Sequence, residues 1–246
     1  MLTPSGAGFQ RQGPLPESGN FLSYAAMNFV RMQSSPAERR DQYARLPPEP
    51  KRVLWLKSLV LLPVGKSDFL ACLTRSGLRA PDGTAWSARS ANTATDELLR
   101  RGLLTESLVC PPALLHLTAV DAAASPEAER LFDAVRRTFP VRTDVPLYAY
   151  NPTATPETLH RLIRLAIYAN DEAAFTAACD FYVKKWSSSG MTSFLVGTYA
   201  EEPLALDWLT SRTPVLQFPL FLARLNAFAV SGVPGPDLPG LLAHYR

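Results

Sequence analysis

The sequence predicts a mainly α-helical protein, in which a winged helix-turn-helix module with a short β-hairpin is followed by repeat-like helical hairpins. Three observations lead to this prediction. Apolar residues recur at helical spacing in several short segments. Glycine or proline follows most of these segments, where a helix would end. A short apolar stretch interrupted by polar residues comes directly after the third helix of the module, where a hairpin would lie.

The composition is that of an ordinary folded chain. The 246 residues are 47% hydrophobic and 19% charged, with a formal net charge of +3. These values exclude a disordered chain and a histone-like basic binder. Proline is abundant, with 22 Pro against 13 Gly, and it predicts short helices with stiff connections.

Residues 1–50 are expected to form a flexible leader with one or two short helices. Within residues 21–32, Phe21 and Phe29 recur at helical spacing, so this segment either binds a protein partner or docks on its own domain. Ser35 followed by Pro36 predicts the start of a second short helix. The prolines of residues 47–50 then break it and precede the first compact unit.

Residues 51–124 are predicted to contain the winged-helix-like module. Its three helices are expected over residues 51–62, from an N-cap at Ser67 to Gly77, and from an N-cap at Ser87 to Gly102. Residues 103–110 predict two short strands, which the following prolines end. Three helices and a small hairpin in this order are typical of a winged helix.

Residues 125–246 are predicted to form a helical C-terminal region. Ser125 is expected to cap a helix over residues 126–139, after a helix over residues 112–124. Thr155 and Asn170 delimit a helical hairpin over residues 156–186. Shorter helices around residues 203–210 and 219–231 would complete a small stack.

The charges are unevenly distributed, and the third helix of the module is the best candidate for a binding surface. Residues 51–104 carry nine basic and four acidic side chains, whereas residues 105–246 carry eleven and fourteen. A helix with Ala91, Ala94, Leu98 and Leu99 inward presents polar side chains outward, as a recognition helix does. The predicted DNA-binding residues are Lys66, Arg79, Arg89, Ser90, Asn92, Thr93, Arg100 and Arg101, with Lys51, Arg52, Lys57 and Arg75 as further backbone contacts. Binding to a protein instead of DNA remains an alternative for this winged helix, because Asp96 on the same face repels phosphate.

The sequence contains no complete catalytic signature. Gly65, Lys66 and Ser67 lack the earlier glycine of a phosphate loop, because position 60 is Val60. The three cysteines and three histidines have no metal-ligand spacing. We therefore expect no catalytic residues, no metal and no cofactor. The apolar run of residues 215–230 is interrupted by polar residues, and we expect a cytoplasmic protein without a membrane span.

Two stretches resemble the N-terminal region of bacterial SWI/SNF-type helicase-like ATPases. They are residues 96–104 with 110–114, and residues 164–168 with Asn170, Asp171 and Phe175. The resemblance covers residues 51–186 and implies a winged-helix-like module and helical hairpins that would precede a DNA-translocating motor. The chain has no D-E-x-H box and too few residues for such a motor, so ATP hydrolysis does not carry over.

The sequence thus predicts a non-catalytic, DNA-associated binding or targeting module, and the resemblance implies an accessory region of a larger helicase-like ATPase. Its partner would be duplex DNA. The alternative is a protein-interaction scaffold that holds a partner through Phe21, Phe29 and the C-terminal helices.

Overall fold

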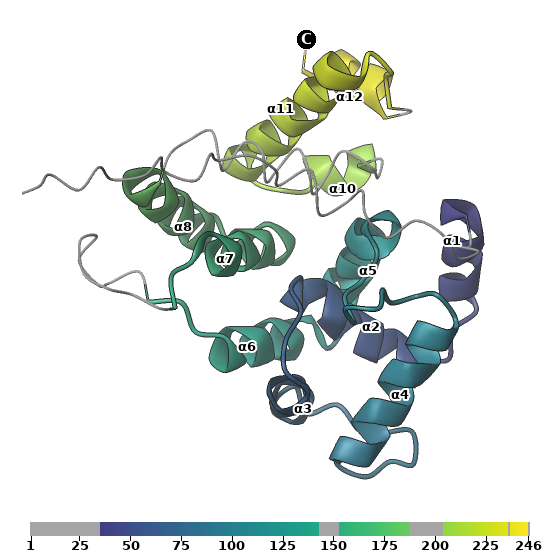
Figure 1. Cartoon of the computed structure of the whole chain (residues 1–246). Coiled ribbons are helices and arrows are strands. Elements are labelled where there is room, and N and C mark those ends of the chain that lie inside the picture. Colours follow the sequence, from purple (N-terminus) through teal and green to yellow (C-terminus); the bar gives the residue numbers. More distant parts are fainter. Residues whose placement is uncertain (1–34, 143–152, 187–203, 236, 246) are drawn as a thin grey trace, which may run out of the picture. The chain divides into compact units, whose positions relative to one another are not determined.

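The computed structural model describes residues 35–142, 153–186, 204–235 and 237–245, and within these ranges it contains eleven α-helices and no strand (Figure 1). The chain divides into two units, Met1–Gln33 and Ser34–Arg246, and all described residues lie in the second. The predicted helix over residues 21–32 lies outside the described residues. The helices are α1 (Pro36–Ala44), α2 (Pro48–Val60), α3 (Lys66–Arg75), α4 (Ala88–Arg100), α5 (Pro112–Ala124), α6 (Ala128–Thr138), α7 (Pro156–Ala169), α8 (Glu172–Lys185), α10 (Leu206–Thr210), α11 (Pro214–Ser231) and α12 (Leu238–His244).

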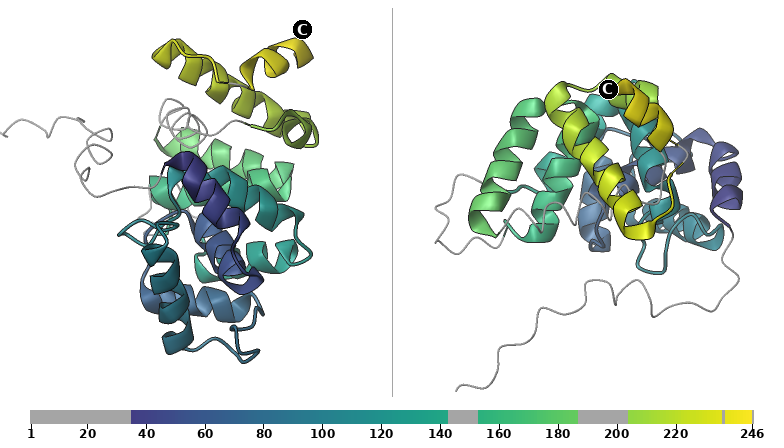
Figure 2. Two further views of the ribbon diagram at one scale, coloured as in Figure 1. Left: turned by 90° about the vertical axis from the view of Figure 1, so that its right-hand side faces the viewer. Right: turned by 90° about the horizontal axis from the view of Figure 1, so that it is seen from above.

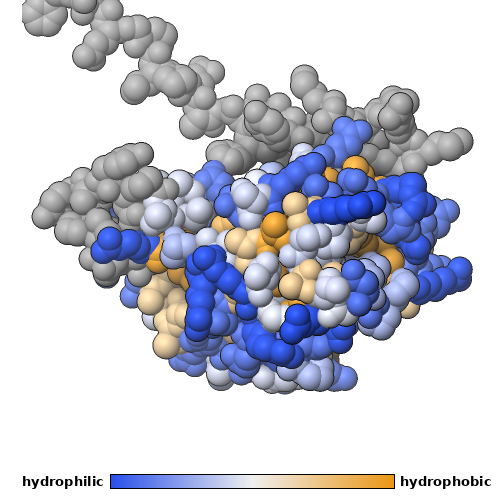
Figure 3. All heavy atoms as spheres, turned by 90° about the horizontal axis from the view of Figure 1, so that it is seen from below, coloured by the Kyte–Doolittle hydropathy of each residue, from blue (hydrophilic) through white to orange (hydrophobic). Residues whose placement is uncertain are grey.

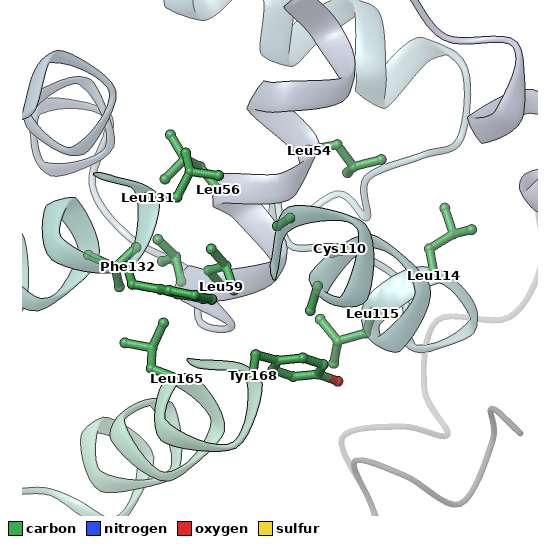
Figure 4. Packing of buried hydrophobic residues seen from close by; sticks show 14 of the residues in the cluster. Leu54, Leu56, Leu59, Cys110, Leu114, Leu115, Leu131, Phe132, Leu165 and Tyr168 are labelled. Atoms are coloured by element: carbon green, nitrogen blue, oxygen red, sulfur yellow. The ribbon is translucent and has the colours of Figure 1, made fainter. Parts of the chain in front are cut away.

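Helix α2 lies at the centre of the packing. From Val53 to Val60 its residues are mostly apolar and, apart from Trp55, buried, and Leu54, Leu56 and Leu59 are fully buried. Helices α3, α4, α5, α6 and α7 all pack against it. Figure 4 shows Leu56 and Leu59 beside Leu131 and Phe132 of α6. A helix that is hydrophobic all round is stable only inside a core. The core accordingly runs without a break past residue 124, from α2 into α6 and α7.

Helix boundaries follow the predicted capping residues at most positions. Ser87 accepts a hydrogen bond from the backbone N–H of Ser90, and Ser90 returns one, so the predicted start of α4 is confirmed. Gly77 and Gly102 have the positive φ that a left-handed residue after a helix needs. The N-cap of α3 is Gly65 rather than Ser67, which lies one residue inside the helix.

The predicted β-hairpin is wrong. Over residues 103–110 the chain makes a tight turn, in which the N–H of Thr105 donates to the carbonyl oxygen of Val109 at 2.9 Å. The N–H of Leu103 is already used to close α4, because it donates to the carbonyl of Leu98. Leu103 and Leu104 are both buried, whereas a strand of a two-stranded hairpin buries alternate residues. The module therefore has three helices and no wing.

The predicted cap of α6 is also wrong. Ser125 is the C-cap of α5, and its hydroxyl donates to the carbonyl of Ala122. Helix α6 begins at Ala128, with Glu127 before it. Pro126 does not start the helix, because Ser125 and Pro126 form the turn that separates α5 from α6.

Helices α7 and α8 form the predicted helical hairpin, and they lie side by side in both views of Figure 2. The hydroxyl of Thr155 accepts from the N–H of Thr158 and caps α7. Asn170 adopts the left-handed conformation that ends α7, and the carboxylate of Asp171 caps α8. One short polar turn thus reverses the chain.

The last helices, α10 to α12, follow residues whose placement is not described. Helix α11 is longer than predicted and contains Pro219, whose missing N–H removes one helical hydrogen bond. Among the described residues it is the one helix whose length and apolar composition would allow it to cross a membrane. Its Arg224 is buried and bound to Asp237 at 2.6 Å.

Candidate nucleic-acid interface

Helix α4 packs through one face and presents the other to solvent. Ala91, Ala94, Thr95 and Leu98 are buried, and the helix contacts α2 and α3. Leu99, predicted to face inward, is only half-buried. Thr95 is buried on the inward face, and its hydroxyl donates to the carbonyl of Ala91. Figure 3 views the molecule from the side on which α3 and α4 lie in Figure 1, and hydrophilic side chains cover much of that face.

The outward face of α4 carries a straight line of polar side chains. Arg89, Thr93, Asp96 and Arg100 are exposed and are spaced by four, three and four residues. Residues at this spacing share one side of a helix. Three of the predicted site residues, Arg89, Thr93 and Arg100, therefore lie together.

Glu97 reduces the positive charge at the end of this line. Its carboxylate forms ion pairs with Arg100 and with Arg101, the latter at 2.6 Å between Oε1 and Nε. Both arginines are well exposed, so these pairs contribute little to stability. They do hold the two guanidinium groups near a carboxylate, which opposes their approach to phosphate.

Two predicted site residues, Ser90 and Asn92, are only partly exposed. The hydroxyl of Ser90 accepts from the N–H of Ser87 and donates to its carbonyl, so Ser90 serves the helix cap. Asn92 is half-buried at the edge of the outward face. Ser90 was expected to be available to DNA, but the capping box of α4 uses its hydroxyl.

Lys66 and Arg79 lie outside α4. Lys66 is the first residue of α3, and Arg79 lies in the connection of residues 76–87 between α3 and α4. Both side chains are exposed. That connection is far longer than the three to four residues that usually join the helices of a helix-turn-helix.

Most of the remaining basic residues of this region bind the protein itself. Lys51 pairs with Asp121 at 3.3 Å, and Arg52 pairs with Glu127 at 2.8 Å. Arg75 donates to the end of α6. The positive charge counted along residues 51–104 is therefore not concentrated on one surface.

Among the residues predicted to contact the DNA backbone, Lys57 differs most clearly from its expected position. Its side chain is buried, and its ammonium nitrogen lies 3.8 Å from the centre of the Phe69 ring. Burial lowers the pKa of Lys57 to about 8. A lysine in this position cannot contact DNA.

The burial of two arginines of α7 was not predicted from the sequence. Arg161 and Arg164 are almost fully enclosed, although α7 lies in a region with more acidic than basic residues. The guanidinium of Arg164 lies 4.7 Å from the ring of Tyr168, whose hydroxyl is 2.8 Å from Nδ1 of His116. Burial, with Arg164 and Arg224 nearby, lowers the pKa of His116 to about 3. The apolar residues around these arginines in the sequence of α7 were the signal that could have predicted their burial.

The described ranges contain no cluster of three or more His, Cys, Asp or Glu side chains that could hold a metal. Comparison with known protein-family models, curated proteins and solved structures found no match.

Proposed function

We propose that the chain is a non-catalytic module that binds duplex DNA through the outward face of α4. The observation that carries this proposal is the line of Arg89, Thr93 and Arg100 on a helix that packs by its opposite face alone. A helix in this position can enter a major groove without disturbing the core. Arginine reads guanine edges or binds phosphate, and threonine binds phosphate.

The proposed module uses α2, α3 and α4 and has no wing. Binding therefore relies on a few cations, which are Arg89 and Arg100 on α4 with Arg79 and Lys66 beside it in sequence. Four phosphate contacts predict that the logarithm of the association constant falls with the logarithm of salt concentration with a slope of about −3 to −4. Weak, salt-sensitive binding is the expected behaviour, as suits an accessory or targeting region rather than a strong sequence-specific repressor.

The test is fluorescence anisotropy with a labelled duplex at several salt concentrations. The double variant Arg89→Gln with Arg100→Gln is expected to weaken binding about tenfold or more at low salt and to reduce the slope by about 2. The matched control is Arg137→Gln with Lys184→Gln, which removes two exposed charges from α6 and α8. Equal losses in the two double variants, or no binding by the wild-type chain at low salt, would overturn the proposal.

A protein-interaction scaffold is the second candidate, and one observation favours it. Val215, Phe218 and Leu222 of α11 are exposed at spacings of three and four residues and form an apolar stripe. Such a stripe fits the apolar face of a partner helix. Phe21 and Phe29, also expected to contact a partner, lie outside the described residues. Partner binding that is lost in Phe218→Ser and retained in Val230→Ser would support this candidate, and equal binding by both variants would contradict it.

A further inference from the structure

A cavity of about 250 Å³ lies between α7 and the end of α6 with the residues that follow it. Its walls are mostly apolar, and its polar lining comes from two arginines and one threonine. The hydroxyl of Thr158 is occupied, because it donates to the carbonyl of Thr153 and accepts from the N–H of Thr155. The lining residues are Arg136, Phe139, Pro140, Val141, Thr158, Arg161, Leu162 and Leu165.

Arg161 is the buried cation of this cavity. The residue is 5% exposed, and its Nε donates to the carbonyl of Val60, at the end of α2, at 2.7 Å. Its guanidinium carbon lies 4.4 Å from the centre of the Phe139 ring. Within the described part of the chain, its two terminal nitrogens, Nη1 and Nη2, make no hydrogen bond or ion pair. These nitrogens are the donors that a carboxylate engages.

The protein does not neutralise this charge with a carboxylate among the described residues. Cys72 lies close enough to influence this charge, but burial raises the pKa of its thiol to about 12, so the thiol is neutral. Burial also lowers the pKa of Arg161 to about 10, the direction expected for a cation that has lost water without gaining an anion. A buried charge without a counter-ion is costly, and such groups concentrate at binding sites.

Arg136 brings a second guanidinium to the same cavity. It is about one-third exposed and lies at a long 3.4 Å from the carboxylate of Asp171. That carboxylate also accepts from the N–H at the start of α8, so it is shared between two partners. Arg136 therefore lies closer to solvent than Arg161, with donors to spare for an entering anion.

We propose that this cavity binds a small organic monocarboxylate with an apolar body, a molecule about the size of benzoate. The carboxylate would meet the terminal nitrogens of Arg161 and a donor of Arg136, and the body would lie against Phe139, Leu162 and Leu165. Arginine is suited to this role because its planar fork matches a carboxylate with two parallel hydrogen bonds. The volume lies below the ~300–1,000 Å³ of most ligand pockets, so the ligand is small. This proposal does not depend on DNA binding by α4.

The test uses the full chain and follows the Arg161 Nε–H signal by NMR during titration with benzoate, together with the unfolding temperature. Saturable shifts and a rise in unfolding temperature with benzoate concentration are expected. Inorganic phosphate, which lacks an apolar body, and benzyl alcohol, which lacks the charge, should each bind at least about tenfold more weakly. Shifts that stay linear with benzoate, or equal binding of all three probes, would overturn the site.

Variants separate ligand binding from a purely structural role of Arg161. Arg136→Gln should weaken benzoate about tenfold, whereas Arg137→Gln, whose exposed side chain on the same helix does not line the cavity, should leave it unchanged. Arg161→Lys keeps the charge but loses the fork, and it should abolish saturation while the chain stays folded. If Arg161 serves only to cap α2, benzoate will not stabilise the wild-type chain, and Arg136→Gln will match Arg137→Gln.

Discussion

Helices α4 and α7 both carry arginines, but the two sets have opposite surroundings. Arg89 and Arg100 of α4 are exposed, whereas Arg161 and Arg164 of α7 are buried. Helix α4 contacts α2 and α3 through one face, while α7 packs against α2, α5, α6 and α8. Charges in water interact weakly and are screened by salt, and charges removed from water require specific partners. The exposed arginines of α4 and the buried arginines of α7 therefore differ in their surroundings, although a count of charges along the chain treats them alike.

The largest expected effect tests a buried ion pair against an exposed one. Asp237→Asn removes the carboxylate charge that pairs with the buried Arg224 and should lower the free energy of unfolding by about 3–5 kcal/mol. Asp133→Asn breaks the exposed pair with Arg137 and should cost less than about 1 kcal/mol. Urea unfolding of both variants measures the difference. Similar losses of unfolding free energy in the two variants would show that burial does not make the Arg224 pair more important than the Arg137 pair.

Acid should destabilise the chain through the buried His116 of α5, which contacts Tyr168 of α7. Because the pKa of His116 is lowered to about 3 in the folded chain, the unfolded chain takes up this proton first as the pH falls below about 6.5. Stability contributed by neutral His116 is therefore present above pH 6.5 and is lost toward pH 3. Between pH 7 and pH 4 the wild-type chain should lose roughly 3 kcal/mol more than His116→Gln. Parallel pH profiles from chemical unfolding would contradict this assignment.

The cap of α4 tests whether the exposed helix depends on its first turn. Ser87→Ala removes the side chain that accepts from the N–H of Ser90 and should lower stability by about 1 kcal/mol. Ser107→Ala, in the exposed turn after α4, is the control and should have almost no effect. Thermal unfolding of the two variants decides the matter, and an unchanged midpoint for Ser87→Ala would exclude the capping role.

Glu97→Gln is expected to have the smallest effect on stability, and it tests most directly whether the exposed face of α4 binds DNA. The change releases Arg100 and Arg101 from their exposed ion pairs and should alter stability by less than about 0.5 kcal/mol. If α4 binds DNA, duplex affinity at low salt should rise about twofold to threefold. Glu172→Gln removes one exposed negative charge from α8 and serves as the control. An equal rise in both variants would assign the effect to net charge alone.

Local signals predicted the helices well and the turn after α4 poorly. Ser35, Ser87, Thr155 and Asn170 mark helix ends in the structure, because capping is decided by hydrogen bonds within a few residues. Residues 103–110 have the composition of two short strands, yet they form a turn, because strand pairing competes with closure of α4 and burial of adjacent leucines. Ser125 was assigned to the wrong helix, since a serine before proline is as suited to end one helix as to precede the next.

The candidate sites show the same division. The exposure of Arg89, Thr93 and Arg100 follows from the apolar periodicity of their own helix, and the sequence sufficed to predict it. The loss of Ser90 to the cap is decided within three residues, so the sequence could have shown it. The burial of Lys57 depends on its contact with Phe69 of another helix, which the sequence did not predict. The cavity beside Arg161 combines residues of α6 and α7 with a carbonyl of α2, far apart along the chain.

The sequence by itself determined that the chain is mainly helical, where most of its helices begin and end, and which face of α4 is polar. Hydrogen bonding to nearby backbone groups and helical periodicity suffice for these features. The tertiary structure alone decided that no wing follows α4, that Lys57 and the α7 arginines are buried, and that a cavity forms beside Arg161. Burial depends on which helices surround a residue, and neighbours a hundred positions away, such as Val60 for Arg161, leave no local signal in the sequence.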